Sequence, residues 1–116
     1  MPKNYSRTDK VGDLVHRIMA RIIREEFKDP RIGMVTVVDV KVSPDLRHAK
    51  VYVTVLELEK VEKTLLVLNE ASGFFRSQLA KVLDLRIIPK PVFIFDDSVI
   101  RGNHIASLIE SNAPKP

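Results

Sequence analysis

The sequence contains no cysteine and no long hydrophobic run. Without thiols there are no disulfides or thiolate ligands, and such a composition is typical of a reducing compartment. The longest apolar runs, residues 65–68 and 92–95, are too short to span a bilayer. The opening MPKNYSRTDK does not have the form of a signal peptide. We therefore expect a soluble cytoplasmic protein without a membrane segment.

Patterns of catalytic and metal sites are also missing. His16, His48 and His104 share no ligand spacing and are interpreted as surface or capping residues. Asp96 and Asp97 could form a catalytic carboxylate pair, but a cap between a strand and a helix explains them with fewer assumptions. There is no phosphate-cradling glycine loop and no nucleophile elbow. We expect no enzyme activity, metal, cofactor or small-molecule substrate.

The length of 116 residues suits one domain, and the hydrophobic fraction of 45% predicts that it folds. We expect a single domain over residues 1–116, with a core at about 6–110 and unanchored tips at 1–5 and 111–116. The net charge of +4 is compatible with a polyanionic partner, but the distribution of charge decides more than its total.

The first element is predicted to be a helix. Ser6 and Asp9 have the spacing of a capping box, and Pro30 disfavours helical geometry just before it, which places the helix end near Phe27. Gly12 is expected to cost up to ~1 kcal/mol of helix stability. Apolar residues at helical spacing form one stripe: Val11, Leu14, Val15, Ile18, Met19, Ile22 and Ile23.

From Met34 the apolar period changes to two, which predicts a strand with one buried face. A turn signal at residues 43–45 precedes a second strand over residues 49–58, so the two strands should pair antiparallel. The expected inward residues are Val38, Val40 and Val42 in the first strand and Val51, Val53 and Val55 in the second.

Helical spacing returns over residues 59–85, with one apolar side made by Val61, Leu65, Leu68, Phe75, Leu79 and Val82. A straight helix of this length, ~40 Å, exceeds a compact domain of this size, which is about 35 Å across. We expect a bend at residues 71–73, because Gly73 is the weakest helix former there. Phe74 and Phe75 are interpreted as core. A strand follows at 92–95, and Asp97 and Ser98 could cap a last helix docked by Ile105, Leu108 and Ile109.

The basic residues of the first helix form a line. At ~100° per residue they fall within about 60° of arc, opposite the apolar stripe, whereas Asp13, Glu25 and Glu26 lie off this line. One interpretation is a row of phosphate contacts, and the other is a solvated helix face without a partner. The line consists of Lys10, Arg17, Arg21, Arg24 and Lys28.

Positive charge also lies just beyond the predicted bend, at Arg76 and Lys81. The bare backbone of Gly73 would let a ribose-phosphate chain come close, and the amides of a helix start suit a phosphate. Alternatively, Gly73 only permits a packing bend. The sequence leaves both interpretations open.

The whole arrangement resembles a type II K-homology domain, and the chain resembles the bacterial ribosome-binding factor A family from about Arg7 to Leu108. Four short motifs carry the likeness in order: KDPRI (28–32), VKVSPDL (40–46) leading into AKVYV (49–53), LNEASGFFR (68–76), and LR (85–86) with Pro89 before Phe93 and Asp96. The resemblance implies an α+β fold of αββααβ order, with a three-stranded sheet packed on helices. It places an Ala-x-Gly kink at residues 71–73 where other K-homology domains have a GXXG loop.

The resemblance further implies a monomeric, non-enzymatic assembly factor. Such a factor binds the free small ribosomal subunit and its 16S rRNA, assists late maturation including the 5′ end, leaves before translation and matters most in the cold. The expected RNA contacts are the helix line together with Arg31, Ser72, Gly73, Arg76 and Lys81. Two other functions remain: a module that binds an acidic protein, and a ferredoxin-like enzyme such as an acylphosphatase, whose fold would open strand-helix-strand.

Overall fold

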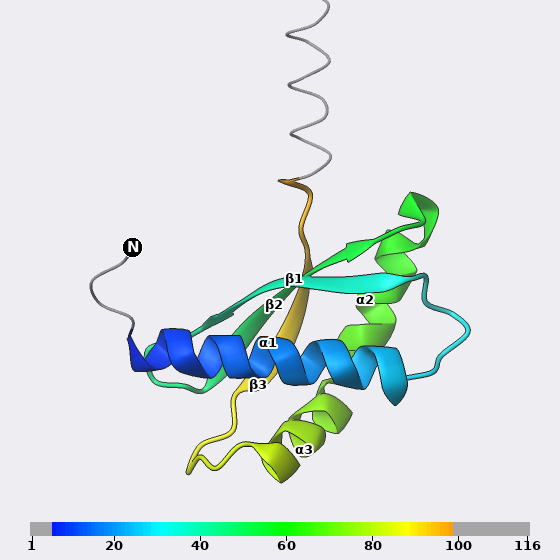
Figure 1. Ribbon diagram of the computed structural model, residues 1–116. Helices are drawn as coiled ribbons and strands as arrows, with labels where there is room; N and C mark the ends of the chain where they lie inside the picture. The colour runs from blue at the N-terminus through cyan, green and yellow to red at the C-terminus, as the bar shows by residue number, and fades with distance from the viewer. Residues whose placement is uncertain (1–5, 99–116) are drawn as a thin grey trace, which may run out of the picture.

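The computed structural model describes residues 6–98 (Figure 1). The elements follow the order α1 (Arg7–Glu25), β1 (Val35–Val42), β2 (His48–Val55), a 3-10 helix η1 (Leu58–Lys60), α2 (Val61–Glu70), α3 (Ser72–Val82) and β3 (Lys90–Phe95). The predicted α+β class and αββααβ order are confirmed. Our expectations for the tips, for the core beyond residue 98 and for a last helix fall outside the described residues.

Helix α1 begins with the predicted capping box. The backbone N–H of Asp9 donates to Ser6 Oγ at 3.2 Å, and the Ser6 N–H donates to Asp9 Oδ2 at 3.1 Å. The helix ends at Glu25, two residues before the expected end. Most of the apolar stripe is buried as predicted, but Leu14 lies at its margin and is 36% exposed.

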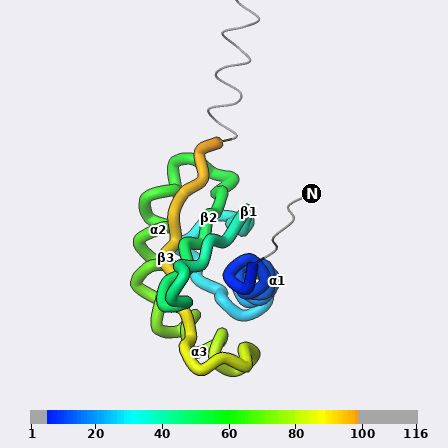
Figure 2. The backbone as a smooth tube through the Cα atoms, turned by 90° about the vertical axis from the view of Figure 1, so that its left-hand side faces the viewer, coloured from blue at the N-terminus to red at the C-terminus, as the bar shows by residue number. Residues whose placement is uncertain are grey.

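The sheet has the strand order β1-β2-β3, with β1 and β2 antiparallel and β2 and β3 parallel. One face carries the buried residues of β2, namely Ala49, Val51, Val53 and Val55. Figure 2 shows α1 beside β1, α2 beside β3, and α3 below both. One hydrophobic core joins residues of α1, all three strands, α2 and α3. We call the opposite surface, which carries Lys50 and Tyr52, the open face of the sheet.

The prediction that Val38 shares the buried face with Val40 and Val42 is wrong. The pairing passes from Val37 opposite Val53 to Asp39 opposite Tyr52, so Val38 is the extra residue of a β-bulge. Val38 is 41% exposed, and Val37 takes the core position at 7% exposure. A bulge shifts the alternation by one residue, which a period of two cannot reveal in advance. Strand β2 also ends earlier than expected, at Val55.

Gly12 allows α1 to lie close to β1. A Cβ atom at this position would come within 3.1 Å of the Val40 carbonyl oxygen and 3.8 Å of the Val42 side chain. The residue that the sequence marks as unfavourable for the helix therefore permits close packing of the helix on the sheet. This contact also fixes the N-terminal half of α1 next to the end of β1 that leads into the hairpin.

The predicted bend is confirmed at Ala71. Helix α2 ends at Glu70, and α3 begins at Ser72 and runs in a clearly different direction (Figure 1). Phe75 and Leu79 on the inner side of α3 are fully buried. Val82, which we expected on this side, is 49% exposed, and Leu83 takes its place at 5%. The chain leaves the helix at Leu83 in an extended conformation, so helical periodicity no longer applies there.

Asn69 closes the outer edge of β3. Its Nδ2 donates to the Phe93 carbonyl at 3.1 Å, and the Phe93 N–H donates to Asn69 Oδ1 at 2.8 Å. The side chain thus replaces a neighbouring strand on an edge that would otherwise expose unpaired backbone groups. It also fixes the end of α2, and hence the bend, against the sheet.

Replacing Asn69 by alanine should destabilise the fold by about 2–3 kcal/mol, because two hydrogen bonds are lost and the Phe93 backbone groups are left without partners. Chemical denaturation measures the change in the free energy of unfolding. The exposed neighbour Glu70, substituted by alanine, is the control and should stay close to the wild type. Equal effects of the two substitutions would show that Asn69 does not brace the edge.

Candidate nucleic-acid interface

The predicted cation line lies on the outer side of α1. Lys10, Arg17, Arg24 and Lys28 are exposed, and Arg21 is partly exposed. The core residues of α1 occupy the opposite side of the same helix. A helix of 19 residues is about 28 Å long at ~1.5 Å per residue, so the line extends across most of the molecule.

His16 makes a contact between α1 and β1. Its Nε2 lies 3.0 Å from the Val37 carbonyl oxygen, which joins α1 to β1. Beside it, Lys10, Asp13 and Arg17 border an open hollow on the surface. The bond to β1 fixes the rotation of α1 about its axis, so it also fixes the direction in which the cation line faces.

The expectation that the acidic residues stand apart from the line is wrong at its C-terminal end. Arg21 Nη1 lies 4.0 Å from Glu25 Oε2 and 3.8 Å from Glu26 Oε1, and Arg24 Nη2 lies 3.6 Å from Glu25 Oε1. All four side chains are more than 40% exposed. Exposed pairs of this kind contribute about 0–1 kcal/mol, so a phosphate can displace these carboxylates at little cost.

Lys28 and Arg31 lie in and around the turn that follows α1. Lys28 Nζ donates to the Arg24 carbonyl at 2.8 Å, which satisfies one of the free carbonyls at the helix end. Arg31 is held by Asp29, with Nη2 2.7 Å from Oδ2 and Nε 3.0 Å from Oδ1. Hydrogen bonds from the Arg31 side chain and backbone lower the pKa of Asp29 to about 2. Arg31 therefore offers a phosphate less free charge than Arg17 does.

The bend adjoins the end of α1 through aromatic contacts. The Phe27 ring lies 5.9 Å from the Phe74 ring and 4.9 Å from the Phe75 ring, measured between centroids. Phe75 is fully buried, as predicted, but Phe74 is 38% exposed. Because Phe27 precedes Lys28 and Phe74 follows Gly73, the C-terminal end of the cation line and the bend share one side of the molecule. We call residues 71–73 the glycine corner.

The packing does not require a glycine at position 73. A Cβ atom there would meet no other atom within 4 Å, and none of the described glycines has a positive φ. Gly73 is exposed, Ser72 is partly buried, and no side chain caps the start of α3. No contact in the structure therefore supports the interpretation that Gly73 only permits a packing bend. The open surface over the first turn of α3 suits close approach of a ligand's backbone instead.

The two remaining predicted contacts lie further along α3. Arg76 Nε donates to the Ile88 carbonyl at 3.1 Å, which directs this side chain to the connector before β3. Lys81 is exposed in the last turn of α3. The structure therefore gathers α1 and the glycine corner on one side and sends Arg76 to a different group of cations.

No local pattern in the sequence indicates this second group of basic residues. Arg47, His48 and Lys90 join Arg76 around a small cleft of about 260 Å³ at the hairpin end of the sheet. The residues come from the hairpin, from β3 and from α3, so no local pattern unites them. The one hint in the sequence is the alternation of the second strand, which places His48 on the opposite side of the sheet from the buried Ala49.

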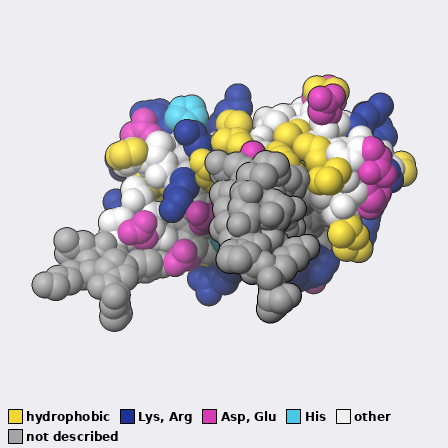
Figure 3. Space-filling model, turned by 90° about the horizontal axis from the view of Figure 1, so that it is seen from above, with side chains coloured by type: hydrophobic (Ala, Val, Ile, Leu, Met, Phe, Trp, Pro, Cys, Tyr) yellow, Lys and Arg dark blue, Asp and Glu magenta, His cyan; other side chains and the backbone are white. Residues whose placement is uncertain are grey.

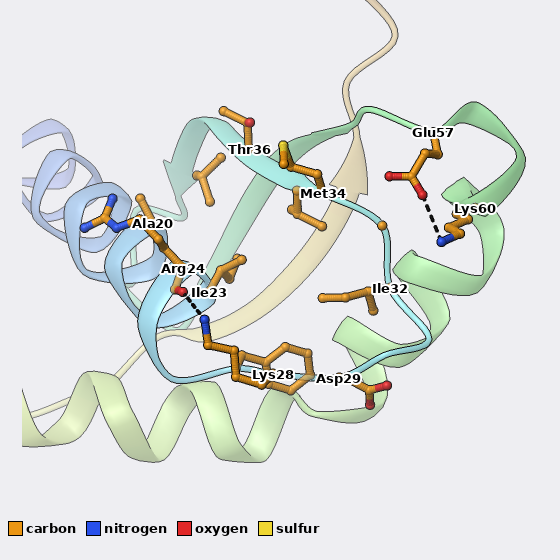
Figure 4. A pocket seen from close by; sticks show the side chains of 14 residues that line it. Ala20, Ile23, Arg24, Lys28, Asp29, Ile32, Met34, Thr36, Glu57 and Lys60 are labelled. Carbon is orange, nitrogen blue, oxygen red and sulfur yellow. Dashed lines mark hydrogen bonds and ion pairs between the residues drawn. The ribbon is translucent and has the colours of Figure 1, made fainter.

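A larger hollow of about 710 Å³ lies between the C-terminal half of α1, the connecting loop and β1 (Figure 4). Ile32 points into this space, and the Glu57–Lys60 ion pair, with its atoms 2.8 Å apart, stands across from Lys28. The Gly33 N–H donates to Thr64 Oγ1 at 3.1 Å and so anchors the loop to α2. The hollow has an apolar floor and borders on two residues of the cation line.

Exposed hydrophobic side chains gather at the other end of the sheet. Met34, Leu56 and Leu58 are 67%, 72% and 58% exposed, and together with Phe95 they line a cleft. Figure 3 shows hydrophobic side chains grouped on the upper face, with Lys, Arg, Asp and Glu side chains around them. Apolar groups of this kind are suited to contact with protein rather than with phosphate. Within residues 6–98, no helix combines the length and the hydropathy of a bilayer-spanning segment.

Comparison with known proteins gives consistent matches. The family model described as "Ribosome-binding factor A" matches residues 7–109. A ribosome-binding factor A of Pseudomonas syringae pv. syringae is 48% identical over 113 residues, which cover 95% of this chain and 82% of the relative. The solution NMR structure of a Thermotoga maritima protein has a TM-score of 0.71 and 31% identity, covering 81% of this chain and 91% of that one.

A third comparison concerns a ribosomal complex. Coordinates of the Thermus thermophilus ribosome-binding factor A, a homology model fitted into the cryo-EM map of a complex with the 30S subunit, match with a TM-score of 0.64 and 28% identity. The match covers 74% of this chain and 91% of that one. The αββααβ fold is therefore that of a known structural family.

Proposed function

The chain belongs to the ribosome-binding factor A family, and on this premise we propose that it binds the free small ribosomal subunit and its 16S rRNA through α1 and the glycine corner. The observation that supports this most is the exposed cation line on α1, whose C-terminal end adjoins the corner. The Thermus relative fitted into a map of a 30S complex provides a precedent for the partner.

In this proposal the protein is a monomeric assembly factor without a catalytic step or cofactor, acting in the cytoplasm. It assists late maturation of the small subunit, including processing of the 16S rRNA 5′ end, and matters most in the cold. It acts by binding one conformation of a maturing rRNA element more tightly than the others. Its effect on the rRNA equilibrium cannot exceed this difference in binding free energy.

The geometry favours recognition of folded RNA. A row of cations about 28 Å long, at ~1.5 Å per residue, contacts several successive phosphates, and such contacts position an RNA without reading its bases. The hollow beside Arg24 and Lys28 offers an apolar floor to an unstacked base, as single-stranded segments of structured RNA provide. The corner adds backbone amides at the start of α3.

Co-sedimentation with ribosomal particles tests the proposed function. We expect the protein to pellet with free small subunits and to remain in the supernatant with large subunits and with joined ribosomes. If six cations meet phosphates, the logarithm of the affinity should fall with the logarithm of salt concentration with a slope of roughly −4 to −5. Capture of an acidic protein in preference to any ribosomal particle would support the protein-interaction alternative instead.

Replacing Gly73 by alanine should separate stability from binding. Helix propensity predicts a gain of roughly 0.5–1 kcal/mol in the free energy of unfolding, because the new methyl group meets no other atom. The same methyl group should weaken subunit binding if RNA backbone lies against the corner. Thermal denaturation and sedimentation measure the two effects, with exposed Ser77, changed to alanine, as the control on the same helix. A stabilised variant with unchanged affinity would remove the corner from the interface.

A further inference from the structure

The hairpin-end cleft brings together basic side chains from three parts of the chain. Arg47 and His48 lie at the start of β2, Lys90 begins β3, and Arg76 belongs to α3. Two backbone contacts fix its walls: the Lys90 N–H donates to the Arg47 carbonyl at 2.8 Å, and Arg76 Nε donates to the Ile88 carbonyl at 3.1 Å. The position of these cations is therefore set by the fold.

The register of the sheet extends this charge onto the open face. His48 pairs with Lys90 across β2 and β3, and Lys41 pairs with Lys50 across β1 and β2. All four side chains are exposed. Like charges directly opposite each other destabilise a sheet, so the Lys41–Lys50 pair is unfavourable where negative charge does not compensate it. We call Arg47, His48, Lys50 and Lys90 the hairpin cluster.

Carboxylates of the chain compensate only part of this charge. Asp39 lies 3.5 Å from Lys41 Nζ, and Asp45 lies 3.8 Å from Arg47 Nε. Asp45 is already engaged by the Ser43 hydroxyl at 2.6 Å and by the Arg47 N–H at 3.0 Å. No ion pair is recorded for Lys50 or Lys90 with any of the residues 6–98. The lining of the cleft includes no acidic residue.

We propose that the hairpin cluster is a second contact for the RNA backbone, separate from the glycine corner and continuous with the N-terminal half of α1. The inference rests on the proposed function, because it takes the same RNA as its ligand. The cleft volume of about 260 Å³ is below the ~300–1,000 Å³ of pockets that enclose whole ligands. It therefore suits a phosphate group and not a complete nucleotide.

The position of the cluster supports a continuous path for the RNA. Gly12 of α1 packs against the hairpin end of β1, and the hairpin and the connector before β3 lie at the same end of the molecule as the start of α1 (Figure 1). The glycine corner instead adjoins the other end of α1. An RNA that follows the cation line from Lys28 to Lys10 would arrive at the end of the molecule that carries the hairpin. A chain of phosphates fits such a long cationic track better than a compact acidic peptide does.

The first test neutralises the cluster. The double variant Arg47→Gln/Lys90→Gln should bind purified small subunits at least tenfold more weakly, and the salt slope should decrease in magnitude by about 1.4 to 1.8 for two lost phosphates. The control Lys63→Glu changes the net charge by the same amount on α2 and should leave both values unchanged. Equal affinities and slopes in the two variants would overturn the second contact while leaving the proposed function in place.

A second variant distinguishes the loss of an RNA contact from a loss of folding. Lys50→Glu places a carboxylate opposite Lys41, so it should raise the melting temperature while weakening subunit binding. Opposite changes in the two quantities support the inference, because a misfolded variant would lose both. Unchanged binding to small subunits together with a higher melting temperature would overturn the inference. Weaker binding to an acidic protein with unchanged binding to small subunits would overturn it as well. If the wild-type chain fails to bind small subunits at all, the proposed function falls and the inference falls with it.

Discussion

Reversing the charges of Arg17 and Arg24 should abolish association with the small subunit while leaving the protein folded. Both side chains are exposed, and of the ion pairs recorded within residues 6–98 only the weak contact with Glu25 involves either of them. Two lost charge-assisted contacts, at about 1.5 kcal/mol or more each, correspond to at least ~100-fold weaker binding. Repulsion between the new carboxylates and the phosphates adds to this loss.

The helix itself should tolerate Arg17→Glu/Arg24→Glu. The new carboxylate at position 17 stands four residues before Arg21 within α1, and this order stabilises helices by about 0.2–0.5 kcal/mol. The control Lys63→Glu reverses an exposed charge on α2, away from the proposed interface. Circular dichroism checks folding, and sedimentation with purified small subunits measures binding.

The comparison between the α1 variant and this control shows whether α1 is the binding site. If the α1 variant still sediments with small subunits, the assignment of α1 as the RNA contact is wrong. If both variants lose binding equally, net charge rather than the cation line determines the affinity. Only selective loss in the α1 variant agrees with the interface described above.

Replacing Phe75 by alanine should have the largest effect on stability. Its ring is fully buried and lies 4.9 Å from the Phe27 ring and 5.0 Å from the Phe93 ring, measured between centroids. It therefore joins the end of α1, the start of α3 and the sheet. Removal of a buried phenylalanine costs about 3–5 kcal/mol. In a domain of this size the melting temperature should fall by at least about 12 °C.

Phe74 provides the matched control on the same helix. It is 38% exposed and contacts Phe27 only from the outside of the cluster, at 5.9 Å. Phe74→Ala should therefore lower the melting temperature much less than Phe75→Ala. Calorimetry of both variants measures the difference. Similar losses would show that the aromatic cluster does not act through the buried ring.

The sequence predicts the parts of this fold that follow from local rules. The capping box of Ser6, the alternation of β2 and the break at Ala71 each depend on residues close in the chain, and each is present in the structure. The bulge at Val38 could not be predicted, because it depends on which residue of β2 lies opposite. The role of Gly12 depends on a contact with β1, which a helical propensity scale does not include.

In the candidate site, too, the sequence predicts the features that depend on residues close in the chain and not those that depend on distant ones. The cation line follows from helical geometry alone, and its residues are exposed or partly exposed in the structure. The contacts of Arg21 with Glu25 and Glu26, and that of Arg76 with Ile88, depend on side-chain reach and on a loop distant in the chain. The hairpin cluster requires the pairing of all three strands, so it becomes visible only when the sheet is assembled.

Lysine acetylation of the protein bound to small subunits tests the central claim most directly, because it reports which surface meets the RNA. Lys10 and Lys28 at the two ends of the cation line should be protected in the complex, whereas Lys63 on α2 should react as it does in the free protein. Mass spectrometry of both samples gives the ratio for each residue. Unchanged reactivity at Lys10 and Lys28 together with protection at Lys63 would contradict the proposed interface.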